Sequence, residues 1–142
     1  MSNFFEKSDL SRNQAENIIS DTLNKCDDGE LYLEDTKSEN VLLDDNKIKN
    51  SSYNSDLGFG FRAVSGDVVA YSHSNEISEN SLKQSSENLK STLKSTQGIY
   101  NQSIPKSNKK YYENINPIEE KTLNSKIEIL NKVNEYLRKK DN

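Results

Sequence analysis

The sequence predicts an α+β protein in which a four-stranded antiparallel sheet is covered by helices, in the order α-ββββ-α, before an irregular arm and a C-terminal helix. Three observations predict this class. Apolar residues recur at helical spacing in three segments, alternating runs fill the region from 30 to 74, and turn-forming residues separate those runs. The expected organisation is a domain over 1–95, a polar arm over 96–121, and an amphipathic helix over 122–142 that leads toward domains absent from this chain.

The composition bounds the size of the core and the kind of partner. The 142 residues are 31% apolar and carry a formal net charge of −4, which suits one modest core and argues against a nucleic-acid binder, since such proteins usually show a basic face. The start, MSNFFEKSDLSRNQ, lacks the pattern of a secretory signal, and no apolar run approaches the roughly 20 residues of a membrane span. We therefore expect a cytoplasmic protein with neither nucleic acid nor membrane as partner.

The first helix is expected over about residues 11–26, where apolar side chains recur at positions i, i+3, i+4 and i+7. These side chains are Ala15, Ile18, Ile19, Leu23 and Cys26. Asp27-Asp28-Gly29 should end the helix, with Gly29 in the left-handed conformation that commonly follows a helix.

Two strands are expected on either side of Asp45-Asn46. Residues 31–34 alternate between apolar and polar, and residues 41–43 continue the same parity. Asp and Asn tolerate positive φ, so a turn is the favoured interpretation of this pair. Metal binding by Asp44 and Asp45 is the alternative, and it is disfavoured because neighbouring side chains on a strand point to opposite faces.

The stretch Gly58-Phe59-Gly60-Phe61-Arg62-Ala63 matches the loose dinucleotide-binding pattern G-x-G-x-x-G/A. That pattern requires an apolar strand before it and a helix after it, whereas here an alternating, β-branched run follows. The sequence therefore predicts a hairpin, with Ser65 and Gly66 in its tight turn and Val68 to Ser74 as the fourth strand.

Gly58, Gly60 and Arg62 point to one side of the predicted strand and form a candidate contact strip. One interpretation is structural, with a bulge or a closely packed neighbour, and with Arg62 solvated or paired with a carboxylate. The other is functional, with Arg62 contacting an anion or a peptide.

No catalytic or metal site is predicted within the chain. His73 is the only histidine and Cys26 the only cysteine, whereas a catalytic zinc needs about three protein ligands. Neither residue has an identifiable partner for nucleophilic catalysis. Cys26 is expected to be a small buried hydrophobe, and His73 a solvated residue near a strand end.

Two further helices are expected after the sheet. Ser78 is a good N-cap, flanked by Ile77 and Leu82 in the positions of a hydrophobic staple, and Gly98 should close this element. The last helix should run from about Thr122 to Lys140. The apolar stripes of these helices are Leu82, Leu89 and Leu93 with Ser85 and Ser86 between them, and Leu123, Ile127, Leu130, Val133 and Leu137.

Two ordered blocks of the sequence resemble one family. The first holds S-Y-N around Tyr53, G-x-G-x-R-A from Gly58, S-G at Ser65-Gly66, and N-E-I-S before the second helix. The second is YYENINPIEEKTLNSKIEILNKVNEYLRKKDN. Together they resemble the N-terminal domain of the TldD/PmbA family, the modulators of DNA gyrase that are zinc metallopeptidases. The R-A-x-S-G form favours the TldD branch.

The resemblance implies proteolysis of unfolded peptides by the full-length family, with the remainder of the peptidase or a TldD/PmbA-type subunit as partner. The family's zinc site is an H-E-x-x-x-H helix plus a distant cysteine, in the later part of a longer protein. The motif is missing from these 142 residues, and Cys26 lies in the wrong region. No catalytic, cofactor-binding or metal residue is carried over, zinc is expected only in the full-length family, and this chain should be an inactive fragment when alone.

Three functional interpretations follow. The favoured one is a non-catalytic portion of a TldD-like zinc peptidase that contributes to the substrate channel and the partner interface. The second is a free-standing module that binds a peptide or protein through a sheet edge or the glycine strip. The third is a truncated gene product without function.

Overall fold

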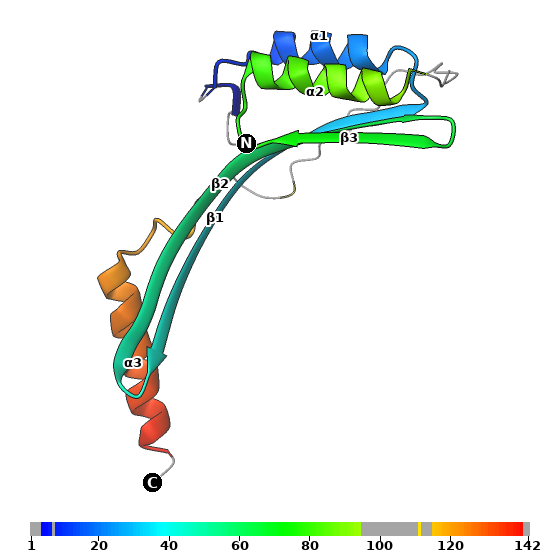
Figure 1. Cartoon of the computed structure of the whole chain (residues 1–142). Helices are drawn as coiled ribbons and strands as arrows, with labels where there is room; N and C mark the ends of the chain where they lie inside the picture. Colours follow the sequence, from blue (N-terminus) through cyan, green and yellow to red (C-terminus); the bar gives the residue numbers. More distant parts are fainter. Residues whose placement is uncertain (1–3, 7, 95–110, 112–114, 141–142) are drawn as a thin grey trace. The chain divides into compact units, whose positions relative to one another are not determined.

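The computed structural model describes residues 4–6, 8–94, 111 and 115–140 (Figure 1). The described strands form one antiparallel sheet in the order β1-β2-β3. The elements in chain order are the 3-10 helix η1 (Phe4–Glu6), α1 (Arg12–Leu23), β1 (Asp28–Asp44), β2 (Lys47–Ser65), β3 (Val68–Ser74), α2 (Glu79–Thr92) and α3 (Leu123–Arg138). The α+β class is confirmed, whereas the expected four strands are wrong in number.

The number of strands differs because the second and third expected strands are one continuous strand, β2. Residues 51–56 read Ser-Ser-Tyr-Asn-Ser-Asp, a composition typical of a turn. None of these residues takes a positive φ, and the segment stays extended with nearly all of its side chains exposed. A polar strand with no buried face gives no alternating pattern, so the sequence marks it as a break.

Both predicted turns are confirmed by the backbone. Asp45 and Asn46 have φ of 45° and 60°, as the two central residues of a type I′ turn require. At the β2–β3 turn Gly66 has φ of 58°, and its N–H donates to Asp27 Oδ2 at 2.6 Å. The G-x-G stretch lies within β2, so the hairpin interpretation holds and the phosphate-loop interpretation is excluded.

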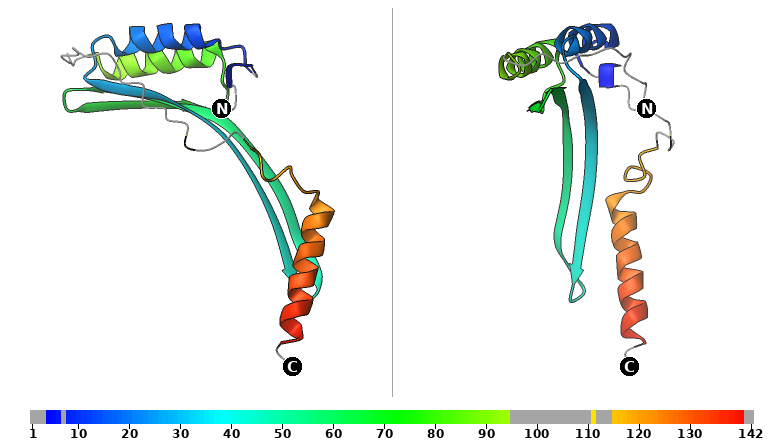
Figure 2. Two further views of the ribbon diagram at one scale, coloured as in Figure 1. Left: turned by 180° about the vertical axis from the view of Figure 1, so that it is seen from behind. Right: turned by 90° about the vertical axis from the view of Figure 1, so that its right-hand side faces the viewer.

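The chain divides into two compact units. Unit 1 comprises Met1–Asp35 with Asp56–Tyr112, and unit 2 comprises Thr36–Ser55 with Glu113–Asn142. In unit 1, α1 and α2 lie side by side over one face of the sheet (Figures 1 and 2). The hydrophobic core lies between these helices and the sheet and consists of Leu10, Ala15, Leu23, Cys26, Phe59, Phe61, Ala63, Ala70, Ile77, Leu82, Leu89 and Leu93.

Hydroxyl groups also belong to this core. Thr22 Oγ1 of α1 lies 2.6 Å from Ser86 Oγ of α2, and Ser72 of β3 donates to Ser85 of α2 at 3.1 Å. Each pair satisfies two polar groups without water, as burial requires. The small side chains also permit the helices and the sheet to approach closely. The predicted stripe of α2, including its serines, is thus confirmed as buried.

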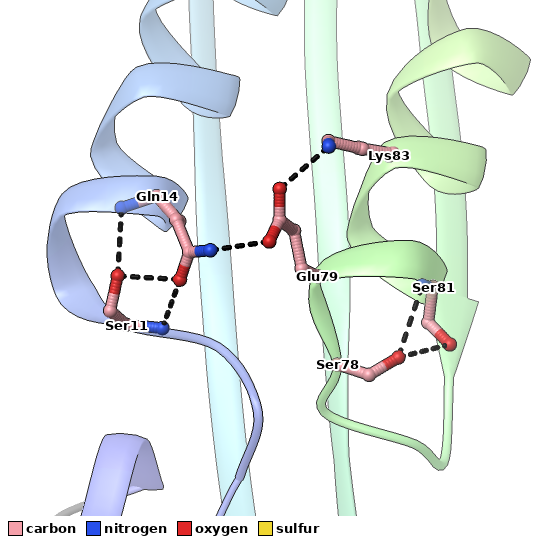
Figure 3. Close-up of polar contacts among 6 residues, drawn as sticks. All are labelled: Ser11, Gln14, Ser78, Glu79, Ser81 and Lys83. Atoms are coloured by element: carbon pink, nitrogen blue, oxygen red, sulfur yellow. Dashed lines mark hydrogen bonds and ion pairs between the residues drawn. The ribbon is translucent and has the colours of Figure 1, made fainter.

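The starts of α1 and α2 are fixed by matching caps (Figure 3). Ser11 accepts from the Gln14 backbone N–H at 3.3 Å, and Gln14 Oε1 in turn accepts from the Ser11 backbone N–H at 2.8 Å, which makes a capping box. Ser78 accepts from the Ser81 N–H at 3.1 Å, so the predicted N-cap is confirmed. Gln14 Nε2 also donates to Glu79 Oε2, so the two caps are joined.

The expectation for Gly29 is wrong. The helix α1 ends at Leu23 with Asn24 as its C-cap, and Gly29 lies within β1 without a positive φ. A Cβ on Gly29 would sit 2.8 Å from the Arg62 carbonyl oxygen and would clash with the Leu23 side chain. Glycine is therefore required there for close packing and not for its backbone freedom.

Unit 2 consists of the β1–β2 ribbon over 36–55 together with α3. The predicted helix from about Thr122 is confirmed, and Thr122 is its N-cap, accepting from the Ser125 N–H at 3.3 Å. The helix lies beside the ribbon (Figure 2) and binds it through polar contacts, among them the ion pair of Lys126 with Glu39. No residue of α3 is buried. The expected Gly98 helix end lies outside the described residues, as does most of the expected arm.

Of the helices in the described part of the chain, none has both the length and the apolar character that crossing a bilayer requires.

Candidate binding face

One face of the sheet of unit 1 points away from α1 and α2 (Figures 1 and 2). Phe59 and Phe61 of β2 are buried against the helices, so Gly60 and Arg62 lie on the opposite face. In β3, Ser72 bonds α2, whereas Tyr71 is 64% exposed. We call this surface the outer face, and its members are Asp28, Glu30, Tyr32 and Glu34 of β1, Gly58, Gly60 and Arg62 of β2, and Tyr71 and His73 of β3.

Arg62 is held on the outer face by two carboxylates of β1. Its Nη2 lies 2.7 Å from Asp28 Oδ2, and its Nε lies 3.0 Å from Glu30 Oε1. The hydrogen bond from Arg62 holds the pKa of Asp28 below its ordinary value, and the bonds to Asp28 and Glu30 raise the pKa of Arg62. The arrangement matches the structural interpretation of Arg62, because an incoming anion would have to compete with both carboxylates.

The two glycines of the candidate contact strip have different neighbours. A Cβ on Gly58 would sit 2.7 Å from the carbonyl oxygen of Ser74, so the absence of a side chain permits close approach of two backbones. A Cβ on Gly60 would meet the hydroxyl of Tyr71 at 2.6 Å. The strip is therefore covered at Gly60 by an aromatic ring from β3.

A shallow cavity of about 230 Å³ opens on the outer face above these glycines. Three of the rings that line it belong to the outer face: Tyr32 from β1, and Tyr71 and His73 from β3. The Tyr71 and His73 rings stack, with centroids 6.0 Å apart and planes inclined by 24°. The remaining lining residues are Glu34, Asp56, Leu57, Gly58, Phe59, Gly60, Ser74 and Asn75.

Two carboxylates give the cavity its charge. The Tyr32 hydroxyl donates to Glu34 Oε2 at 2.8 Å, and this contact raises the pKa of Tyr32. Asp56 adds a second carboxylate, and neither lysine nor arginine is among the lining residues that the structure describes. The cavity thus combines aromatic faces with negative charge.

The described residues do not form a zinc site. Cys26 is 3% exposed and lies in the core, where burial and then the neighbouring Asp27 raise the pKa of its thiol. His73 projects from the outer face of the sheet instead, so these two donors are separated by the sheet itself. Within the described part of the chain, no three His, Cys, Asp or Glu side chains are grouped so that they could hold a metal ion.

Reasoning from the sequence found the glycines and Arg62 but missed the cavity. The signal that was available is parity: Tyr32 and Tyr71 occupy polar positions of their strands, where a large ring is exposed. The pairing of Arg62 with Asp28 and Glu30 joins residues 34 and 32 positions apart. Predicting it requires the strand register, which the pattern alone does not supply.

Comparison with known proteins gives a consistent result. The family model for the PmbA/TldA metallopeptidase domain 1 matches residues 29–95. The metalloprotease TldD homolog of Buchnera aphidicola subsp. Schizaphis graminum is 32% identical over 117 residues, which cover 82% of this chain and 24% of that relative. The metalloprotease TldD homolog of Haemophilus influenzae is 33% identical over 121 residues, which cover 81% of this chain and 24% of that relative.

The chain thus spans about a quarter of the length of the curated relatives it matches. These relatives carry the TldD name, in agreement with the branch that the R-A-x-S-G form favours. The matched region 29–95 begins in β1 and contains β3, α2 and every member of the outer face except Asp28. Residues 29–95 of this chain are therefore similar to the first domain of the PmbA/TldA metallopeptidases.

Proposed function

We propose that the chain acts as the first, non-catalytic domain of a TldD-like zinc metalloprotease in the cytoplasm. The observation that carries this proposal is the match of residues 29–95 to domain 1 of the family. In this role the domain contributes to the substrate channel and to the interface with the remainder of the peptidase or a TldD/PmbA-type subunit. Unfolded peptides are the substrate class.

The donor set supports a non-catalytic role for this segment. Cys26 is enclosed in the core and His73 stands on the other face of the sheet, so neither can complete a zinc site with the other. Zinc, when bound in the full-length family, polarises the scissile carbonyl and activates water. Those steps belong to residues outside this chain, and the contribution here is to position the peptide.

A domain exchange tests the proposal. The region of the Haemophilus influenzae relative that aligns with residues 29–95 is replaced by residues 29–95 of this chain, and peptidase activity and zinc content are measured. We expect activity in the exchange and none when the region is deleted, with zinc retained in both. A zinc-loaded exchange protein without activity, or a fully active deletion, would contradict the proposal.

A free-standing binding module is the second candidate, because β3 lies at one edge of the sheet that the described strands form. An extended segment can pair with such an edge through its backbone. Two results together would favour this candidate. The purified chain would pull down one specific peptide or protein, and the genome would encode no H-E-x-x-x-H segment that acts with the chain.

A further inference from the structure

We propose that the cavity on the outer face binds the cationic side chain, lysine or arginine, of an extended polypeptide. That the ligand is a peptide rests on the proposed function. That its side chain is positively charged rests on the residues that line the cavity.

The size of the cavity limits its occupant. Its volume of about 230 Å³ is smaller than the roughly 300–1,000 Å³ of pockets that enclose a small-molecule ligand. Gly58 and Gly60 form part of the lining, but the Ser74 backbone and the Tyr71 hydroxyl already occupy the space beside them, so the cavity does not deepen there. One long side chain fits these limits, whereas a whole nucleotide or cofactor does not.

The rings favour a cation. Tyr32 and Tyr71 are 58% and 64% exposed, so their faces are available to a ligand. A positive group within about 6 Å of such a face is attracted by the negative potential of the ring. A guanidinium can also stack on the face of an aromatic ring.

The charges favour a cation as well. Glu34 and Asp56 line the cavity, and its described lining residues include no lysine or arginine. Arg62, on the same face, is engaged by Asp28 and Glu30 and is therefore not directed at the cavity. An acidic side chain would instead be repelled by the like charge of these carboxylates, and an apolar one would not be attracted by it.

The position of the cavity explains why the cation should belong to an extended chain. The strand β3 forms one edge of the sheet, and Ser74 and Asn75 at its end line the cavity. A segment paired with that edge would send every second side chain toward the outer face. A lysine or arginine at such a position can fold over β3 toward the rings.

The test compares two probe peptides with the 142-residue chain: acetyl-Thr-Val-Lys-Val-Thr-amide and the same peptide with Nε-acetyl-lysine. Binding is followed by NMR on the ring signals of His73, which are unique because the chain has one histidine. We expect the lysine peptide to bind about fivefold more tightly, with a preference that falls as salt is raised. Equal affinities, or no shift of the His73 signals with either peptide, would overturn the inference.

Matched variants assign the preference to the cavity. Tyr71→Leu removes an aromatic face but retains bulk over Gly60, and Asp56→Asn removes one charge at an exposed position. Both variants should lower the ratio of the affinity for the lysine peptide to the affinity for the acetyl-lysine peptide toward one. Tyr53→Leu, an exposed tyrosine of unit 2 outside the cavity, should leave it unchanged. A preference that survives both cavity variants, or that Tyr53→Leu also abolishes, would contradict the inference.

The outcome is separable from that of the proposed function. The domain exchange reports whether the fold serves a TldD-like peptidase, whatever side chain its substrate carries. Failure of the lysine preference in an active exchange protein would reject the cation site alone. Failure of the exchange, with a lysine preference intact in this chain, would reject the peptidase role and retain the site.

Discussion

The side chain of Tyr71 lies diagonally across the strand pair, over the backbone of Gly60. In the register Tyr71 stands opposite Arg62, yet a Cβ on Gly60 would sit 2.6 Å from the Tyr71 hydroxyl oxygen and 3.1 Å from Cε2. A glycine in a strand interior is commonly compensated by such a cross-strand aromatic ring. The group beside Gly60 on the outer face is therefore the end of a side chain and not a backbone atom.

The two strip glycines should respond differently to alanine. At Gly58 the new Cβ meets the backbone of Ser74, which cannot move without disturbing the β2–β3 pairing. At Gly60 it meets the end of the Tyr71 side chain, which can rotate. We expect Gly58→Ala to lower the free energy of unfolding by about 1–3 kcal/mol and Gly60→Ala by less than about 1 kcal/mol. Urea denaturation measures both, and equal losses would contradict the distinction.

Two buried serines should also differ when replaced by alanine. The Ser65 hydroxyl is buried and has no hydrogen-bond partner among the described residues, so Ser65→Ala should be neutral or stabilising by up to about 1 kcal/mol. The Ser86 hydroxyl bonds Thr22, and Ser86→Ala should destabilise by about 1 kcal/mol. Thermal and urea unfolding of the two variants show which substitution costs more stability. A larger loss at Ser65 would indicate a bonded hydroxyl.

The Asp28–Arg62 pair should give unit 1 a small stability term that depends on pH. The folded-state pKa of Asp28 lies below its ordinary value of 3.8, chiefly through the hydrogen bond from Arg62. The contribution is therefore present above that ordinary value and is lost as pH falls through the folded pKa. Because the pair is exposed, it is worth no more than about 1 kcal/mol. Wild type should exceed Asp28→Asn in stability at pH 6 but not at pH 2, and a constant difference would refute the linkage.

The thiol of Cys26 should report the opening of unit 1. It is buried, its Sγ donates to the Thr22 carbonyl oxygen at 3.6 Å, and its pKa is raised, so little reactive thiolate is present. We expect alkylation by iodoacetamide to be slow in the folded chain and to accelerate with urea as the chain unfolds. Cys26→Ala with Ser51→Cys, which places a thiol at an exposed position, should react quickly in both states. Equal rates for the two folded proteins would show that the core is open.

Hydrogen exchange should distinguish α3 from the β2–β3 hairpin. The helix α3 has no buried residue, and Val133 and Leu137 are 50% and 55% exposed, whereas Phe61 of the hairpin is 0% exposed. Helices that bury little are marginal in water. Amides from Leu123 to Leu137 should exchange much faster than those from Phe59 to Tyr71. Equal protection that vanishes on dilution would reveal that a second copy covers the helix.

Local chemistry made the helix starts and the two tight turns predictable. Ser11, Ser78 and Thr122 each combine a short hydroxyl with a following helical pattern, and each is an N-cap in the structure. The turns at Asp45-Asn46 and Gly66 were predictable for the same reason, because few residues tolerate positive φ. Such signals act within a few residues and do not depend on the rest of the fold.

Features that depend on distant contacts were not predictable. The strand β2 continues through 51–56 although these residues carry no apolar alternation, because pairing with β1 supplies what the side chains do not. Gly29 is constrained by Leu23 and by the Arg62 backbone, one of which lies across the sheet. The cavity likewise joins residues of three strands, whose register has to be known first.

The hydroxyl contacts between α1, α2 and β3 change how the lean composition of this chain should be judged. A mean hydropathy of −0.97 suggests too few apolar side chains to form the core of a folded domain. Serine side chains nevertheless fill interior volume here, because their hydroxyl groups are hydrogen-bonded to other hydroxyl groups of the core. Replacing Ser85 or Ser86 by leucine would raise the hydropathy score and yet force the layers apart. A redesign that only raises the hydropathy of buried positions would therefore destabilise this core.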